Sequence, residues 1–482
     1  MFESTVGEIL EATGARPCCG ASDTVVRGAC IDSRQVGEGG LFVCFPGERV
    51  DGNDYAPKAI EAGAHAVALT REASDELVRQ AEEAGCALMR IQGDDAEEFM
   101  LRLAGAWRRK NPQWTVVGVT GSVGKTTTKD MLACSLATRY RVHATKGNFN
   151  NLIGVPLTML SASPDDELVV CEMGMNHTGE LERLSACALP TVAVITNVGT
   201  SHIGLLGSRE NIARAKAEIL SSMEPSDKSV NGVSPCLAMT SDNDFASFIE
   251  EGFARPRGVE VVYVGASQGA RVSARDVRLD GEGFASFDLC LSDGWSLPVK
   301  LTVPGPKVIA DFLLAMAIVD RLGVDREAAA RAIEQMPQTH MRLEVVKKPG
   351  RPRVIDDSYN ASPSSMAAAL DVLASMSCEG RRVAVLGEMG ELGSEADRLH
   401  GYVGAYAAAK DLDLLVFVGT EEALQMAAAA RTMGFSEDKL EIVEDVDAAK
   451  RVIAPILKAD DLVLVKASRS AGLDAFAQEV LA

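Results

Sequence analysis

Apolar residues along the chain gather in short runs that alternate with stretches of helical spacing. The runs at 115–120 (TVVGVT), 167–174 (ELVVCEMG) and 191–199 (TVAVITNVG) each have the length of a buried parallel strand. Stretches with helical spacing follow them at 126–140 and 208–223. This alternation predicts a doubly wound parallel sheet with helices on both of its faces.

A second series of apolar runs predicts another α/β unit, of the Rossmann type, in the last third of the chain. Between the two series, residues 259–303 alternate polar and apolar positions, and we expect them to interrupt the first unit with β-structure. The apolar stretch 308–323 is expected to be a buried helix. The expected strands of the second series lie at 351–359, 381–389, 413–419 and 460–468.

The first 110 residues contain short strand patterns and turns. An amphipathic helix is then predicted within 94–113, and it should end at Asn111-Pro112, because a proline disfavours helical geometry in the residue before it. We therefore expect an α/β protein of three domains. These are a small N-terminal α/β domain at 1–110, a central domain with the doubly wound sheet at 111–337, and a C-terminal Rossmann-like domain at 338–482.

Composition narrows the possible partners and the compartment. The 482 residues carry a formal net charge of -20, which repels nucleic acid and anionic membranes, so neither is an expected partner. No apolar run approaches the ~18 residues of a membrane span. The N-terminal MFESTVGEILEATG lacks the basic start and apolar run of a signal peptide, and the 11 cysteines lack metal-type spacing. We therefore expect a protein of the reducing cytoplasm, and a monomer.

The segment 116–129, VVGVTGSVGKTTTK, has the features of a phosphate-binding loop. A strand pattern precedes it and a helical pattern follows, so backbone N–H groups and a helix N-terminus can converge on phosphate oxygens. The match to the Walker A pattern is not strict, because Val119 stands where a glycine is required. Lys125 can reach the β- and γ-phosphates, and Thr126 or Thr127 offers a hydroxyl to Mg²⁺. The residues expected to hold the nucleotide are Gly121, Ser122, Val123, Gly124, Lys125, Thr126 and Thr127.

Polar residues stand where two of the expected strands end. Glu172 closes the run at 167–174, and His202 follows the run at 191–199. The carboxyl ends of parallel strands face the ligand crevice in such sheets, so Glu172 is a candidate Mg²⁺ ligand and His202 a candidate ligand or acid-base group. Lys216 lies in a helical pattern, NIARAKAEIL, which by itself predicts a surface lysine.

Seven motifs that occur in order indicate a family. They are GVTGSVGKTTTK, KGNFNNLIGVP, EMGMNHTGEL, TNVGTSHIGLLGSRENIARAKAEI, IDDSYNASPSS, LGEMGELGSEADRLH and LVKASRS. Together they resemble the Mur ligase family, the ATP-dependent amide-forming enzymes of peptidoglycan precursor synthesis. The segment DSRQVGEGGLFVCFPGERVDG resembles that family's N-terminal uridine-nucleotide domain, so the resemblance covers nearly the whole chain.

The resemblance implies a reaction and a set of site residues. ATP would phosphorylate the terminal carboxylate of UDP-N-acetylmuramoyl-tripeptide, and the amine of D-alanyl-D-alanine would then attack the acyl phosphate. The third residue of the tripeptide stays open. The implied catalytic residues are Lys125, Glu172, His202, Lys216 and Arg342; the implied Mg²⁺ ligands are Thr126, Glu172, His202 and Lys216, the last as a carbamate; Asp357 would contact the ribose and Asp311 the adenine; and the substrate-binding residues are Ser33, Arg34, Asn150, Asn151 and Asn360.

Several positions depart from the pattern of the family. In GPKVIADFLLAMA, Lys307 and Asp311 stand where histidine and asparagine are common at the adenine site. A carboxylate only accepts hydrogen bonds, so Asp311 would satisfy the amine of adenine alone, and Lys307 would neutralise it across one helical turn. The C-terminal motif, which includes Lys466, Ser468 and Arg469, has Ala467 in place of the usual glycine.

Two alternatives stay open on the sequence. One is a ligase of the same family that adds a single amino acid, although its usual Asp-Asn-Pro-Arg motif is absent here. The other is a nucleotide-binding scaffold that has lost catalysis, which the altered adenine segment would suit. The retained Lys125, Glu172, His202 and Lys216 argue against such a scaffold.

Overall fold

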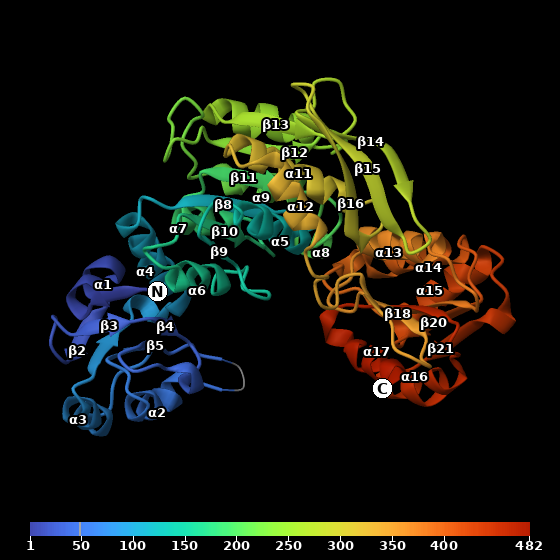
Figure 1. The fold of residues 1–482 in the computed structure, drawn as a ribbon. Coiled ribbons are helices and arrows are strands. Elements are labelled where there is room, and N and C mark those ends of the chain that lie inside the picture. The colour runs from blue at the N-terminus through green and yellow to red at the C-terminus, as the bar shows by residue number, and fades with distance from the viewer. Residues whose placement is uncertain (48–49) are drawn as a thin grey trace.

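The N-terminal part of the chain forms a small sheet covered by helices (Figure 1). The computed structural model describes residues 1–47 and 50–482, so Glu48 and Arg49 of the uridine-domain motif lie outside the described residues. The order of the five-stranded sheet is β2-β7-β6-β5-β4, with β2 antiparallel to β7 and the other pairs parallel; β1 pairs antiparallel with β3. The elements are β1 (Glu3–Thr5), α1 (Val6–Thr13), β2 (Arg16–Cys19), β3 (Val25–Arg27), β4 (Ala29–Cys30), β5 (Leu41–Val43), α2 (Ala56–Glu61), β6 (Ala66–Leu69), α3 (Asp75–Ala84) and β7 (Ala87–Arg90).

Helix α4 (Ala96–Lys110) joins this sheet to the central part of the chain, and it confirms the amphipathic helix predicted there. The Asp95 side chain caps it by accepting a hydrogen bond from the Glu98 N–H. Basic residues in its last turn complement the negative end of the helix dipole. The helix packs against α1 and against α6 (Gly154–Ser161) and α7 (Glu180–Ala188) of the central unit.

The central unit is built on a nine-stranded sheet with the order β16-β15-β14-β13-β12-β11-β8-β10-β9. The strands from β9 to β13 are parallel, which confirms the doubly wound sheet. The predicted β-rich segment begins with β13, which is parallel to β12, and continues into β14, β15 and β16, which pair antiparallel with one another. These strands extend the same sheet at its edge and do not interrupt it. The strands are β8 (Thr115–Thr120), β9 (Val142–Ala144), β10 (Leu168–Glu172), β11 (Val192–Ile195), β12 (Cys236–Thr240), β13 (Glu260–Val264), β14 (Val272–Leu279), β15 (Phe284–Leu291) and β16 (Ser296–Pro304).

Helices cover both faces of this sheet, because successive side chains of a strand point to opposite sides. In β8, Val116 packs into one core, together with residues of α6 and α7, while Val117 and Val119 pack into the other. The buried helix predicted at 308–323 is α11, which lies against α5 in the second core. The remaining helices are α5 (Lys125–Leu136), α8 (Ile203–Leu206), α9 (Arg209–Ala217), α10 (Ala246–Ile249), α11 (Val308–Arg321) and α12 (Arg326–Glu334).

The C-terminal unit is a six-stranded sheet with the order β17-β18-β22-β19-β20-β21, in which only β17 is antiparallel to its neighbour. This confirms the second α/β unit. Its elements are β17 (Glu344–Val346), β18 (Arg353–Asp356), α13 (Pro363–Ser375), β19 (Arg382–Leu386), α14 (Ala396–Ala408), β20 (Leu414–Val418), α15 (Glu421–Thr432), β21 (Leu440–Val443), α16 (Val446–Val452), β22 (Leu462–Lys466) and α17 (Asp474–Leu481).

The N-terminal and C-terminal units lie at opposite ends of the central unit (Figure 1). Each of the three large sheets falls inside one of the predicted domain ranges, whose exact limits stay a prediction. Between α12 and β17 the chain passes through Met341 and Leu343, whose φ angles are 58° and 50°. In the part of the chain that the structure describes, no helix has the length and apolar character needed to cross a bilayer.

Candidate active site

Three neighbouring strands of the central sheet bring the predicted site residues together. Strand β8 lies between β10 and β11, and all three are parallel, so their carboxyl ends meet at one edge. The phosphate-binding loop follows β8 and runs into α5, which begins at Lys125. Gly124 has a φ of 87°, and a Cβ on Gly121 would lie 1.8 Å from Thr196 Oγ1. The loop therefore requires glycine at both positions.

Residues that follow β11 hold this loop in shape. The Val123 N–H donates to Asn197 Oδ1 at 3.1 Å, and Asn197 Nδ2 donates back to the Val123 carbonyl at 2.8 Å. The Thr196 hydroxyl donates to the same carbonyl, and the Gly199 N–H donates to Ser122 Oγ at 2.9 Å. Sequence reasoning missed Asn197, although it stands directly after a predicted strand in TNVGTSHIG.

Lys125 is the centre of a cluster of charges. Its Nζ donates to the Gly121 carbonyl at 2.9 Å, and burial lowers its pKa below the ordinary value of a lysine. Glu172, Arg342 and Glu391 all lie close enough to act on this charge. The structure thus brings together three residues that the sequence singled out, and it adds Glu391 from the C-terminal unit.

Glu172 has the environment of a metal ligand. It ends β10 and is 1% exposed. Its Oε1 accepts a hydrogen bond from Asn150 Nδ2 at 2.7 Å, whereas Oε2 has no partner among the described residues. A buried carboxylate oxygen without a partner is costly unless a cation or a donor completes it. In this arrangement Asn150, which was predicted to contact substrate, holds Glu172.

Lys216 is buried, so the surface position that its helical pattern indicated is wrong. It is 2% exposed, and burial, followed by the nearby charge of Lys125, lowers its pKa well below that of a free lysine. Burial disfavours the charged form of this amine, and the unprotonated form is the nucleophilic one. Among the described residues, no three His, Cys, Asp or Glu side chains are grouped to hold a metal ion. Further oxygen ligands for a cation beside Glu172 would come from a carbamylated Lys216, from the nucleotide or from water.

His202 faces the C-terminal unit. Its Nδ1 lies 2.5 Å from Glu391 Oε2, a contact whose angles fall outside hydrogen-bond geometry, and the neighbouring ring lowers the pKa of Glu391. Thr126, the predicted hydroxyl ligand, is buried in the first turn of α5. Arg342 lies over the ring of Tyr359, with Cζ 4.2 Å from the ring centroid.

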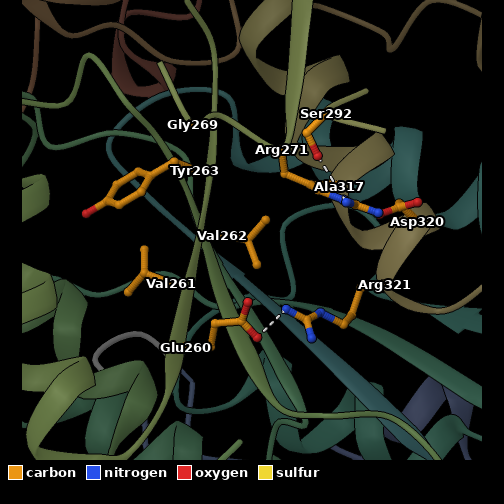
Figure 2. A pocket seen from close by; sticks show the side chains of 10 residues that line it. All are labelled: Glu260, Val261, Val262, Tyr263, Gly269, Arg271, Ser292, Ala317, Asp320 and Arg321. Atoms are coloured by element: carbon orange, nitrogen blue, oxygen red, sulfur yellow. Dashed lines mark hydrogen bonds and ion pairs between the residues drawn. The ribbon is translucent and has the colours of Figure 1, made fainter. Parts of the chain in front are cut away.

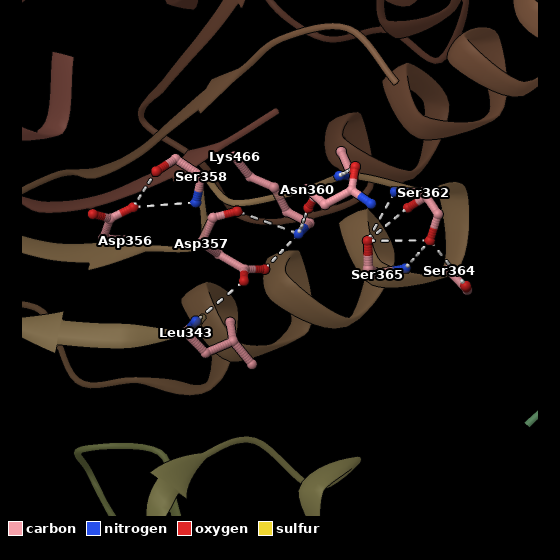
Figure 3. A network of polar contacts seen from close by, with 10 residues as sticks. Leu343, Asp356, Asp357, Ser358, Asn360, Ser362, Ser364, Ser365 and Lys466 are labelled. Carbon is pink, nitrogen blue, oxygen red and sulfur yellow. Dashed lines mark hydrogen bonds and ion pairs between the residues drawn. The ribbon is translucent and has the colours of Figure 1, made fainter. Parts of the chain in front are cut away.

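A buried lysine holds together the residues that follow β18 in the C-terminal unit (Figure 3). Lys466 is 1% exposed, and its Nζ donates to Asp357 Oδ2 at 2.6 Å and to the Asn360 carbonyl at 2.9 Å. Asp357 Oδ1 accepts from the Leu343 N–H at 3.1 Å. Both oxygens of Asp357 are thus engaged, and its contact with ribose stays a prediction.

Asp311 lies against the phosphate-binding loop. Its Oδ1 accepts from Thr128 Oγ1 at 3.1 Å, and a Cβ on Gly124 would lie 2.3 Å from the same oxygen. Burial raises the pKa of Asp311 to about 8, so the group is largely protonated near neutrality and can donate as well as accept. Its contact with adenine stays a prediction. The pairing with Lys307 is wrong, since Lys307 is exposed and makes no ion pair with Asp311 within the described parts of the chain.

Two of the remaining predicted substrate residues lie on the N-terminal unit, whereas Asn151 directly follows Asn150 at the central site. Ser33 and Arg34 belong to a short 3-10 helix, Ser33–Gln35, of the N-terminal unit. Arg34 pairs with Asp32 at 2.7 Å and its side chain is 87% exposed, so it is accessible to a ligand. Asn151 Oδ1 caps α6 by accepting from the Gly154 N–H at 2.8 Å.

A cavity of about 500 Å³ lies elsewhere, between β13, β14 and α11 (Figure 2). Its two arginines are neutralised within the cavity wall: Arg271 pairs with Asp320 at 2.7 Å, and Arg321 pairs with Glu260 at 2.6 Å. This cavity has no free cation to hold a phosphate and is not the nucleotide site.

Comparison with known proteins agrees with this geometry. Three family models match the chain: "Mur ligase family, catalytic domain" at residues 25–108, "Mur ligase middle domain" at 119–319, and "Mur ligase, glutamate ligase domain" at 341–469. Among solved structures, the chain is similar to MurF from Acinetobacter baumannii, with a TM-score of 0.86 and 28% identity over 100% of both chains. It is also similar to the MurF ligase of Thermotoga maritima in complex with ADP, with a TM-score of 0.76 and 26% identity over 95% of this chain and 98% of that one.

Curated relatives extend over nearly the same length. The UDP-N-acetylmuramoyl-tripeptide–D-alanyl-D-alanine ligase of Bacillus subtilis is 32% identical over 476 residues, which are 99% of this chain and 97% of the relative. The enzyme of the same name from Escherichia coli is 31% identical over 453 residues, which are 94% and 93% of the two chains. With the phosphate loop, the buried carboxylate and the three sheets in place, the chain belongs to the Mur ligase family.

Proposed function

We propose that the chain is an ATP-dependent ligase that joins D-alanyl-D-alanine to UDP-N-acetylmuramoyl-tripeptide through an acyl phosphate. The observation that carries this proposal is the meeting of Lys125, Glu172 and Arg342 at the carboxyl edge of the sheet. Relatives that carry the name of this activity match the chain from end to end. The ADP complex of a similar enzyme supports ATP as the phosphoryl donor.

The phosphate-binding loop would hold the triphosphate. The first N–H groups of α5, which begins at Lys125, lack acceptors within the helix, and the N-terminus of α5 adds the positive end of its dipole. Lys125 now donates to the Gly121 carbonyl, and it would turn from this oxygen to the β- and γ-phosphates. Arg342 lies between α12 of the central unit and β17 of the C-terminal unit, and it supplies a second cation. These charges screen the carboxylate, the triphosphate and the developing oxyanion from one another.

The residues present fit Mg²⁺ at this edge. Glu172 Oε2 is a buried oxygen without a partner among the described residues, and Thr126 and His202 offer a hydroxyl and an imidazole. The carboxylate and the hydroxyl are hard oxygen donors, which suit Mg²⁺, whereas the imidazole is a softer nitrogen donor. The ion would supply a positive charge that polarises the phosphoryl oxygens.

Lys216 fits the carbamate that the family resemblance implies. A neutral amine attacks carbon dioxide, an N–C bond forms, and one proton leaves to solvent. The product is an anion, which is suited to a cation that the lysine itself would repel. The burial that lowers the pKa of Lys216 supports this modification, because only the unprotonated amine reacts.

The proposed reaction indicates where the enzyme works and whether it needs a second subunit. ATP and a UDP-linked precursor occur together in the cytoplasm, and the cysteines that the structure describes are free thiols, as expected in a reducing compartment. We place the reaction there and expect a monomer, because ligands from a second subunit are not needed to explain the site.

Phosphate release tests this function against its alternatives. With ATP, UDP-N-acetylmuramoyl-tripeptide and D-alanyl-D-alanine, the enzyme should release phosphate and form the pentapeptide, whereas single amino acids in place of the dipeptide should not support turnover. Turnover with a single amino acid would indicate a different ligase of the family. Nucleotide binding without turnover for any amine would indicate a scaffold. Parallel assays with diaminopimelate and lysine in the tripeptide identify its third residue.

A further inference from the structure

A loop of the C-terminal unit contacts the central site at a residue to which the proposed reaction gives no role. Residues 387–392 follow β19, and their Glu391 makes the ion pair with His202. Next to this pair the Gly204 N–H, in α8, donates to the Glu391 carbonyl at 3.2 Å. A Cβ on Gly204 would lie 2.4 Å from the backbone nitrogen of Gly393. The two units therefore dock backbone against backbone at this point.

His202 and Glu391 both have an unfavourable backbone conformation. The φ angles are 64° for His202 and 63° for Glu391, in the left-handed region that residues with a Cβ rarely adopt. Such conformations persist only where the surroundings determine them, and they gather at functional sites. In these two left-handed conformations the side chains of His202 and Glu391 face each other.

Contacts with other elements of the C-terminal unit also hold this loop in place. The Met389 N–H donates to Nε2 of the fully buried His400 at 2.9 Å. Glu388 accepts at Oε1 from the Ser470 hydroxyl at 2.7 Å. These contacts come from α14 and from the motif after β22, so Glu391 is held by rigid elements of its own unit.

We propose that Glu391 is a positioning residue: its carboxylate holds the His202 imidazole in one tautomer and one orientation, and it does so only while the C-terminal unit is docked. An acceptor beside Nδ1 favours the tautomer that carries its proton there and leaves the lone pair of Nε2 free for a ligand. A carboxylate that orients a histidine in this way ties the arrangement of the central site to the docking of a distant part of the chain. The idea rests on the proposed function only in so far as His202 serves that site.

Nitrogen-15 spectra of the histidine rings test the contact without turnover. The chain has 6 histidines, and H202A identifies the signals of His202. In the unmodified enzyme Nδ1 of His202 should carry the proton, and in E391A the ring should become a mixture of tautomers. The variant E391G removes the same carboxylate and relieves the left-handed backbone, so it keeps the protein folded if E391A does not. The control is E395A, because Glu395 lies just after this loop and pairs with Arg398 at the start of α14.

Kinetics and metal binding separate positioning from a general structural role. We expect E391A to lower kcat about 10-fold or more with little change in KM for ATP, and to weaken binding of Mn²⁺ alone about 10-fold. In the H202A background, E391A should have no further effect on Mn²⁺ binding. Unchanged ring spectra in E391A, or effects of E391A and H202A that add independently, would overturn the proposal. If the spectra change as expected but no variant or parent shows ligation, only the proposed function fails.

Discussion

At the scale of single residues, Lys125 carries the largest share of the proposed chemistry. Its Nζ sits on the Gly121 carbonyl, within reach of the charges of Glu172 and Arg342. A fixed cation at the phosphates acts mainly as charge develops in the transition state. K125A should therefore lower kcat by roughly 10²-fold or more and leave the fold intact, as measured by phosphate release and circular dichroism. Near-normal turnover by a folded variant would remove this loop from the active site.

Asp311 makes the stability depend on pH. Its pKa is about 8 in the folded protein against 3.8 when unperturbed, so between these values the folded state binds the extra proton. The free energy of unfolding therefore falls as pH rises through this window, by about 1.4 kcal/mol for each unit of pKa difference. D311N keeps an acceptor for Thr128 and removes the titration. Urea unfolding should show D311N gaining on the parent between pH 5 and pH 8, and an equal difference at both pH values would contradict the assignment.

The burial of Lys216 leads to a chemical prediction. Burial lowers the pKa of the amine and so favours its neutral form, which can react with carbon dioxide. Carbon-13 NMR in labelled bicarbonate should show a carbamate signal that K216A lacks, and short carboxylates should restore part of the activity of K216A. Active protein without that signal would show that the amine is unmodified. K228A is a matched control, because Lys228 is an exposed lysine of the same unit.

At the scale of elements, the sequence predicts the strands and the phosphate-binding loop well. Their signals are local: an apolar run, glycines, and a lysine at the start of a helix. The partner of Asp311 is not predictable in this way, because Thr128 lies 183 residues away along the chain. Helical spacing does place Lys216 among the apolar residues Ile212, Ala213, Ile219 and Leu220, but a lysine alone predicts a surface position, so its burial was missed. Glu391 was missed because its partner belongs to another unit.

The β-rich segment shows where pattern reasoning fails within an element. Alternating residues correctly indicate half-exposed strands, but alternation does not say which edge they join. Strand β14 pairs with β13 through Val264 and Val272. This parallel pairing joins the antiparallel strands β14, β15 and β16 to the edge of the central sheet.

At the scale of the whole molecule, a protein with a net charge of -20 is proposed to bind three anionic groups. The local cations Lys125 and Arg342 make this possible, and the second of them comes from the segment that joins the central and C-terminal units. Arg34 lies on the N-terminal unit, at the opposite end of the molecule from the C-terminal unit (Figure 1). A substrate that reaches from Arg34 to Lys125 would therefore connect the N-terminal and central units, and closure of the C-terminal unit over it would exclude water from the acyl phosphate.

The acyl phosphate is the central claim, and oxygen transfer tests it most directly. The tripeptide substrate is prepared with oxygen-18 in both oxygens of its terminal carboxylate and is turned over with ATP and D-alanyl-D-alanine. Mass spectrometry of the released phosphate should find one labelled oxygen in each molecule, because that oxygen bridges carbon and phosphorus before the amine attacks. The amide product should keep the other. Phosphate without label, formed together with the amide, would contradict the account.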